Sequence, residues 1–87
     1  MTFLLIPGAG GSAWYWHRVV ALLEQHGERA VAVDLPADDD DADLITYADI
    51  ASTAVLDADG PLTVVGQSMG ALTAPIVAER LPTAALV

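Results

Sequence analysis

The motif that most constrains the fold of this 87-residue chain is the run Gly-Gln-Ser-Met-Gly at residues 66–70. An apolar, strand-like segment precedes it, and a helical pattern begins near Ala71. A G-x-S-x-G motif between a strand and a helix is typical of a nucleophile elbow, a tight turn that raises a serine hydroxyl above the edge of a sheet. Gly66 and Gly70 are expected there because a Cβ at either position would clash where the two backbones crowd together. Ser68 is therefore the candidate nucleophile, and a glycine-rich turn with a surface serine is the alternative.

Strand-like and helix-like segments alternate along the chain. We expect strands over residues 2–7, 29–34 and 62–65 and from 84 onward, and helices over 14–26, 46–58 and 71–81. This alternation predicts an α/β fold, a three-layer αβα arrangement around a mainly parallel sheet. Right-handed crossovers give the strand order two, one, three, four, with the first two helices on opposite faces.

Finer features of the helices also follow from the pattern. The first helix is amphipathic, and its expected core positions are Val19, Val20, Leu22 and Leu23. Residues 46–49, Thr-Tyr-Ala-Asp, resemble a capping box that opens the second helix. Pro75 is expected to kink the third helix because it removes an amide donor from the helix interior.

Two glycine-rich loops are expected to face each other across one crevice. One is the run Pro-Gly-Ala-Gly-Gly at residues 7–11, and the other is the elbow. Attack on an acyl carbon requires two donors aimed at the oxygen that becomes negative. The backbone amide of Met69, directly after the serine, is the first candidate, and the amide of Ala9 in the facing loop is the second. A plain strand-to-helix connection without a ligand is the alternative for residues 7–11.

The same loop also fits a different class of binding site. Residues 8–13 match G-x-G-x-x-A between a strand and a helix, and Asp34 ends the next strand, where a ribose-binding acid lies in NAD(P)-binding Rossmann-type domains. The bulky residues 14–16, Trp-Tyr-Trp, stand near where the pyrophosphate of a dinucleotide would lie. A Rossmann-type domain also does not explain the G-x-S-x-G motif at residues 66–70. We therefore rank the dinucleotide site below a serine nucleophile but keep it open.

Composition limits the possible partners. The formal net charge is −9, and the three arginines are scattered along the chain, which argues against nucleic-acid binding and against an anionic membrane surface. There are no cysteines, so disulfides and thiolate chemistry are excluded. The apolar runs are too short to span a membrane, and residues 1–6 do not resemble a signal peptide, so a cytoplasmic location is expected. We expect no metal and no cofactor.

For the other polar and aromatic residues, a structural explanation is favoured over a role in the site. His17 and His26 both lie on the expected first helix, and neither is expected to reach Ser68. Asp34 is more consistent with structural capping than with the acid of a catalytic triad. The acidic run 38–41 lacks the glycine and the spaced acids of an EF-hand loop, so a solvated loop is favoured over a calcium site. Residues 14–16 fit core packing beneath the first loop or, alternatively, an acyl pocket.

Three segments together resemble one known superfamily. Residues 5–16 (Leu-Ile-Pro-Gly-Ala-Gly-Gly-Ser-Ala-Trp-Tyr-Trp), residues 31–36 (Val-Ala-Val-Asp-Leu-Pro) and the elbow are similar to the α/β-hydrolase superfamily, especially its hydroxynitrile lyase and methyl-esterase-like branch. The resemblance spans the chain, which covers only the N-terminal portion of that fold. It implies Ser68 as the nucleophile, with Ala9 and Met69 as oxyanion-hole donors.

The chain also departs from this family's pattern. Pro7 stands where the family usually has histidine, and residues 37–39 replace a common Gly-His-Gly. The family's acid and histidine follow the serine in chain order. Residues 1–87 are therefore expected to form a partial α/β-hydrolase domain, truncated before the triad acid and histidine.

The resulting interpretation is a serine hydrolase of ester-like substrates that works through an acyl-enzyme at Ser68 and is present here as an incomplete N-terminal fragment. Esterase, lactonase, amidase and lyase chemistry are not separated by these residues. A non-catalytic fragment or interaction module is the second reading. Because the last strand would leave an apolar edge unpaired, the isolated chain is expected to self-associate or to fold poorly.

Overall fold

The computed structural model describes residues 1–8 and 10–87 and contains a four-stranded sheet with three α-helices. The elements, in chain order, are β1 (Thr2–Ile6), the 3-10 turn η1 (Ala13–Trp16), α1 (His17–Gln25), β2 (Arg29–Ala32), α2 (Leu44–Ala54), β3 (Leu62–Gly66), α3 (Gly70–Arg80) and β4 (Thr83–Leu86). The predicted α/β class is confirmed. The predicted boundaries differ mainly at η1, which precedes α1 as a separate turn, and at α2, which starts and ends earlier.

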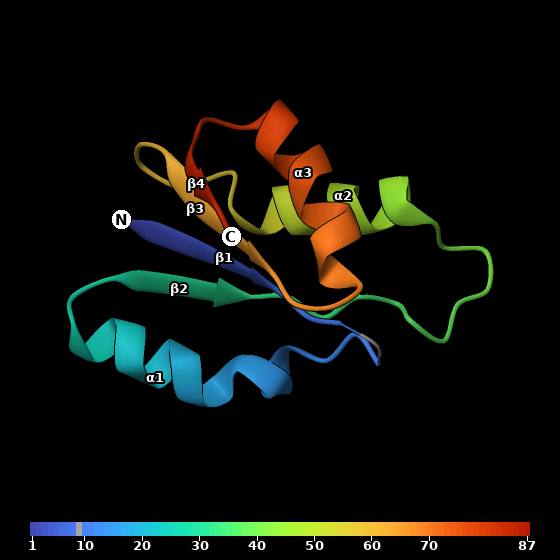
Figure 1. Cartoon of the computed structure of the whole chain (residues 1–87), viewed down its shortest axis with the longest axis horizontal. Helices are drawn as coiled ribbons and strands as arrows, with labels where there is room; N and C mark the ends of the chain where they lie inside the picture. The colour runs from blue at the N-terminus through green and yellow to red at the C-terminus, as the bar shows by residue number, and fades with distance from the viewer. Residues whose placement is uncertain (9) are drawn as a thin grey trace.

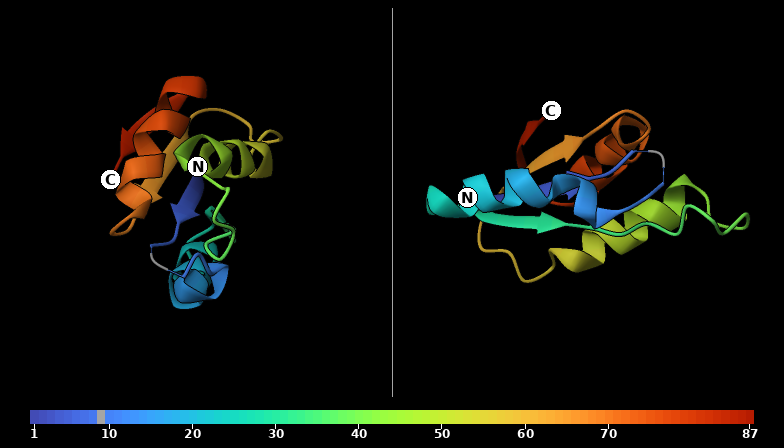
Figure 2. Two further views of the ribbon diagram at one scale, coloured as in Figure 1. Left: turned by 90° about the vertical axis from the view of Figure 1, so that its right-hand side faces the viewer. Right: turned by 90° about the horizontal axis from the view of Figure 1, so that it is seen from below.

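The sheet has the order β2-β1-β3-β4, and every neighbouring pair is parallel, as predicted. Figures 1 and 2 show α1 on one face of the sheet and α2 with α3 on the other. The chain therefore changes faces between its first and second crossovers. This reversal brings the loop after β1 and the turn after β3 to the same edge, which is where open α/β sheets bind ligands.

The main core lies between the sheet and the α2–α3 layer. It is formed by buried apolar side chains from β1, β3, the segment after β2, and both helices: Leu4, Ile6, Val33, Leu35, Ala48, Ala51, Val55, Leu62, Val64, Ala74 and Val77. The small residues of α2 and α3 let these helices pack closely against each other. Because β1 is central, Leu5 is buried as well. Strands buried on both faces explain the apolar run of β1.

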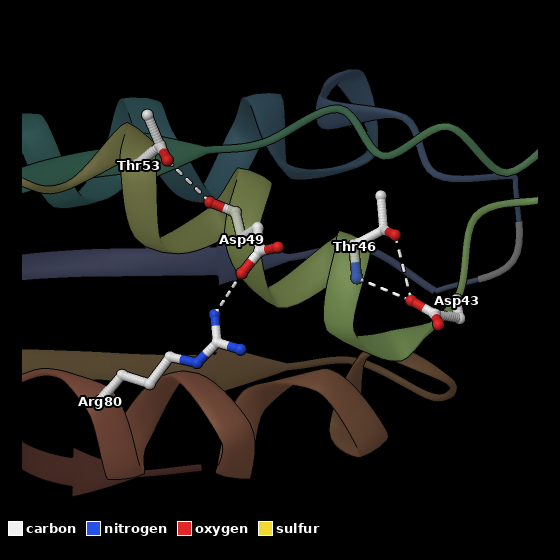
Figure 3. A network of polar contacts seen from close by, with 5 residues as sticks. All are labelled: Asp43, Thr46, Asp49, Thr53 and Arg80. Atoms are coloured by element: carbon white, nitrogen blue, oxygen red, sulfur yellow. Dashed lines mark hydrogen bonds and ion pairs between the residues drawn. The ribbon is translucent and has the colours of Figure 1, made fainter.

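Asp43, rather than Thr46, caps α2, so the predicted capping box over 46–49 is wrong (Figure 3). The Asp43 carboxylate accepts the Thr46 N–H at 2.9 Å and the Thr46 hydroxyl at 3.0 Å. These bonds, the backbone one first, hold the pKa of Asp43 below its usual value. Asp49, the expected capping-box acid, instead accepts the Arg80 guanidinium at 2.6 Å and ties α2 to the end of α3. Earlier capping lets α2 begin one turn before the capping-box pattern indicated.

The predicted core positions of α1 are wrong, because this helix buries none of its residues. Val20 and Leu23 are half-buried, whereas Val19 and Leu22 are exposed. The reason is that α1 packs against β2 and η1 at one side of the sheet, while α2 and α3 pack against each other on the opposite face. The apolar stripe of α1 is therefore only partly covered.

β4 forms one edge of the sheet, and both its last residue, Leu86, and the following Val87 have exposed apolar side chains. Its inner side is paired: the Val87 N–H donates to the Val64 carbonyl at 2.8 Å. Self-association through the outer side remains a prediction. Within the described residues, no helix is long and apolar enough to cross a membrane.

Candidate active site

Ser68 has the backbone conformation expected of a nucleophile elbow. Its φ is +55°, and among residues 1–8 and 10–87 it is the only residue other than glycine with a positive φ. A serine in this left-handed region costs of order 1–3 kcal/mol and persists only where the surrounding structure enforces it. The Ser68 side chain is exposed at the edge of the sheet, between the end of β3 and the first residue of α3.

Two glycines enforce this turn by letting backbones approach each other. A Cβ added to Gly66 would lie 2.5 Å from the Gly70 carbonyl oxygen. A Cβ added to Gly70 would lie 2.7 Å from the Ile6 carbonyl oxygen and 2.8 Å from that of Pro7. All of these neighbours are backbone atoms, which have no rotamer to change. Any side chain at either position would push α3 away from β1 or β3.

The loop after β1 lies directly against the elbow. The Gln67 N–H donates to the Ile6 carbonyl at 3.2 Å, which extends the β1–β3 pairing into the turn. A Cβ on Gly8 would come within 2.5 Å of the Gln67 side-chain oxygen and 3.1 Å of the Ser68 Cβ. The two predicted loops therefore meet. Ala9, the predicted second oxyanion donor, lies outside the described residues.

Met69 occupies the N-cap position of α3, and its side chain is exposed. Backbone N–H groups in the first turn of a helix have no partner within the helix, and the helix dipole favours negative charge there. The position is therefore suited to an oxyanion donor, the role predicted for the Met69 amide.

The segment after β2 holds the loop after β1 in place. The Leu35 N–H donates to the Gly11 carbonyl at 2.7 Å, and the Ala13 N–H donates to Oδ1 of Asp34 at 2.7 Å. Gly11 has φ +65° and lies so close to the Leu35 carbonyl that a Cβ would clash. Asp34 thus anchors the start of η1, in agreement with the structural role expected from the sequence.

The Asp34 contact leads to a prediction about dinucleotides. Because its carboxylate already accepts a backbone N–H, we expect titration with NADH or NADPH to show no saturable energy transfer from Trp14 and Trp16. Fluorescence at cofactor concentrations up to the millimolar range measures this. Saturation at micromolar cofactor would establish the dinucleotide alternative.

A cavity of about 220 Å³ adjoins the elbow on the side of α2. Its walls come from the loop after β1, the segment after β2, α2, and the start of α3: Pro7, Gly8, Gly10, Gly11, Leu35, Ala37, Tyr47, Met69, Gly70 and Thr73. The glycines and Met69 were predicted from the sequence as parts of the site, whereas Tyr47 and Thr73 were not. The available signal for Thr73 was its position three residues after Gly70, which places both on one face of α3.

Neither histidine is hydrogen-bonded to Ser68 in the described part of the chain. Nδ1 of His17 donates to the Trp14 carbonyl at 2.7 Å, and Nδ1 of His26 donates to the Leu22 carbonyl at 2.8 Å. The His17 ring also stacks on Trp14, with 4.2 Å between the ring centroids. These local contacts agree with the expectation that neither histidine reaches Ser68.

The three aromatic residues 14–16 differ in burial. Trp16 is buried, with its ring edge-on to Tyr15, whereas Trp14 and Tyr15 are exposed. None of the three is among the residues that line the cavity. The acidic run 38–41 is exposed, and across the described ranges no three Asp, Glu or His side chains are grouped so that they could hold a metal ion.

Comparisons with known proteins agree with this geometry. Residues 3–87 match the model of the alpha/beta hydrolase family. The chain is 36% identical to "Probable esterase PIR7A" of Oryza sativa subsp. indica, over 92% of this chain and 34% of the relative. It is 35% identical to "Methylesterase 8" of Arabidopsis thaliana, over 92% and 33%. The crystal structure of polyneuridine aldehyde esterase superimposes with a TM-score of 0.76 at 26% identity, covering 91% of this chain and 34% of that one.

The chain therefore belongs to the alpha/beta hydrolase family. It spans about a third of the length of the curated relatives that it matches. The predicted family and fold are thus confirmed.

Proposed function

We propose that this chain is the nucleophile-bearing N-terminal part of a serine esterase that acts on small ester-like substrates. The observation that carries the proposal is the backbone of Ser68, a non-glycine residue held at φ +55° at the junction of β3 and α3. Strain of this kind at an exposed serine is explained by a need to present its hydroxyl. The similarity to proteins named as esterases supports the choice of an ester.

In the proposed reaction, Oγ of Ser68 attacks the ester carbonyl carbon. The carbonyl oxygen becomes an oxyanion that accepts hydrogen bonds from the backbone N–H groups of Met69 and Ala9. Collapse of this intermediate breaks the ester C–O bond and releases the alcohol, leaving an acyl group on Ser68. Water then attacks the acyl-enzyme, which releases the carboxylic acid and restores the serine.

The serine requires a general base, since an ordinary hydroxyl is a weak nucleophile. Nδ1 of His17 and Nδ1 of His26 each donate to a carbonyl of their own helical segment, and within the described residues neither ring is hydrogen-bonded to Ser68. We propose that the base and its orienting acid belong to the full-length enzyme beyond residue 87, in the family's chain order of serine, acid and histidine.

A fluorophosphonate probe tests this proposal on the full-length enzyme. We expect the probe to label the protein and the label to disappear in Ser68→Ala, because the probe bonds only to an activated serine Oγ. Ser52→Ala is the matched control, since it removes the same atom from a buried serine of α2 whose hydroxyl has no partner in the described structure. Equal labelling of Ser68→Ala and the wild type would refute the proposal.

A further inference from the structure

Gln67, the residue before the candidate nucleophile, turns its side chain toward the loop after β1. The residue is half-buried. A Cβ built on Gly8 would have the Gln67 side-chain oxygen as its nearest neighbour, at 2.5 Å, and the Gln67 carbonyl oxygen next, at 2.9 Å. The Gln67 amide therefore occupies the space that a side chain at position 8 would need, and the loop packs against it because position 8 is glycine.

The backbone of Gln67 is fixed at both of its polar groups. Its N–H donates to the Ile6 carbonyl at the end of β1 at 3.2 Å, and its carbonyl accepts the Gly70 N–H at the start of α3 at 2.9 Å. Movement of this backbone away from the loop would break both hydrogen bonds, each of which contributes about 0.5–1.5 kcal/mol. The Gln67 side chain therefore has a rigid base and limits how closely the loop can approach the elbow.

The far end of the same loop is fixed by the segment after β2. Two hydrogen bonds of 2.7 Å, one accepted by the Gly11 carbonyl and one donated by the Ala13 N–H, join the loop to that segment. The loop is therefore held from two sides, there and at Gly8, where Gln67 supports it.

The contact at Gly8 lies next to the atoms of the proposed reaction. The Cβ position of Gly8 is 3.1 Å from the Ser68 Cβ, so Gln67 and Ser68 both border Gly8. Gly8 is bonded to Ala9, whose N–H is proposed as the second oxyanion donor. Such a donor acts at about 2.7–3.1 Å from the oxyanion, and a misplacement of about 1 Å can lower the rate about a hundredfold. The position of Gly8 therefore bears directly on the rate.

We propose that Gln67 is a positioning residue: its side chain supports the loop after β1 and thereby sets the distance between the second oxyanion donor and Ser68. This inference rests on the proposed function, because it assumes that an oxyanion forms at this edge of the sheet. The support comes from the volume of the side chain, since its contact with Gly8 is one of packing. An oxyanion donor acts in the transition state, so substitutions of Gln67 change kcat rather than KM.

The test measures hydrolysis of p-nitrophenyl acetate by variants of the full-length enzyme. Gln67→Ala is expected to lower kcat about tenfold to a hundredfold and to leave KM within about twofold, because the loop loses its support and the donor moves out of position. Gln67→Met keeps the length and volume of the side chain without the amide, and its kcat is expected to stay within about threefold of the wild-type value. Gln25→Ala is the matched control, because it removes the same atoms from an exposed glutamine of α1, and its kcat is expected to equal that of the wild type.

A double-mutant cycle with Gly8→Ala tests the contact itself. Gly8→Ala alone is expected to lower kcat, because the added methyl group meets the Gln67 side chain. In the Gln67→Ala background, the factor is expected to be smaller by about threefold or more, since the nearest atom has been removed. Some loss remains there, because the Gln67 carbonyl oxygen still lies 2.9 Å from the added methyl group. Equal factors in the two backgrounds would overturn the proposal.

The outcomes separate the role of Gln67 from the underlying function. Values of kcat are expressed per serine labelled exhaustively by the fluorophosphonate probe, so that a loss of folded protein does not register as slower catalysis. A wild-type kcat in Gln67→Ala, or an equal loss in Gln67→Met, would overturn the role of Gln67 and leave the esterase proposal intact. Labelling and hydrolysis that persist in Ser68→Ala would overturn both. If Gln67→Ala fails to fold, Gln67→Asn, which shortens the side chain by one methylene group, provides the same comparison.

Discussion

Gly70→Ala is expected to destabilise the full-length protein by about 3 kcal/mol or more and to abolish labelling of Ser68. The added methyl group would lie 2.7 Å from the Ile6 carbonyl oxygen and 2.8 Å from that of Pro7. Both are backbone atoms of the central strand and its loop, so relief requires α3 to move away from the sheet. Overpacking of this kind typically costs 1–3 kcal/mol, and more where no side chain can yield. The methyl group of Gly66→Ala would lie 2.5 Å from the Gly70 carbonyl oxygen, so the same loss of stability and of labelling is expected for this variant.

Gly60→Ala is the control for this experiment. Gly60 has φ +82°, and among the described atoms none lies within 4 Å of its added Cβ. Alanine at this position loses only about 1–2 kcal/mol of stability, the cost of the left-handed backbone conformation for a residue with a Cβ. Labelling of Ser68 is therefore expected to persist. Denaturant unfolding of the three variants gives the comparison. If Gly70→Ala were no less stable than Gly60→Ala, the close approach of α3 to β1 would be wrong.

The 87-residue chain by itself is expected to hydrolyse p-nitrophenyl acetate no faster than its own Ser68→Ala variant. The members of a serine triad act as a unit, so loss of the base costs about as much as loss of all members, roughly 10⁶-fold in kcat. Within the described residues neither histidine is hydrogen-bonded to Ser68: Nδ1 of His17 donates to the Trp14 carbonyl, and His26 lies at the C-terminal end of α1. Stopped-flow absorbance of nitrophenolate measures both proteins.

The full-length enzyme, assayed in parallel, provides the positive control for that measurement. It is expected to show turnover that Ser68→Ala eliminates. A burst from the 87-residue chain that depends on Ser68 would show that a residue within it serves as the base. His17→Ala and His26→Ala would then identify which histidine it is.

Local patterns were sufficient to predict the layer order and the elbow. Strict alternation of strands and helices left few arrangements for right-handed crossovers, and the strand order followed. The conformation of Ser68 followed from the two glycines that flank it, because only a sharp turn explains both. In these cases a short-range signal and the global fold point to the same structure.

The errors arose where distant partners decide the outcome. The amphipathic pattern of α1 predicted that Val19 and Leu22 are buried, but both are exposed. An apolar helix face is buried only where another element packs against it, and the helix's own sequence does not specify that element. Thr46 and Asp49 had the spacing of a capping box, yet the upstream Asp43 caps the helix and Arg80, thirty-one residues away, engages Asp49. Thr73 resembles any other helical threonine in the sequence, and its position beside the cavity depends on the packing of four separate segments.

The hydrogen bonds from Leu35 to Gly11 and from Ala13 to Asp34 have a consequence for how the chain tolerates changes in length. They fix the loop after β1 to two consecutive residues of the segment after β2, so the spacing between Ala32 and Leu35 is as constrained as that of the elbow itself. One residue inserted there would pull both anchor points out of reach. The acidic stretch that follows, from Asp38 to Asp41, is exposed and makes no such contacts with that loop among the described residues, so it is the place where insertions can accumulate without disturbing Ser68.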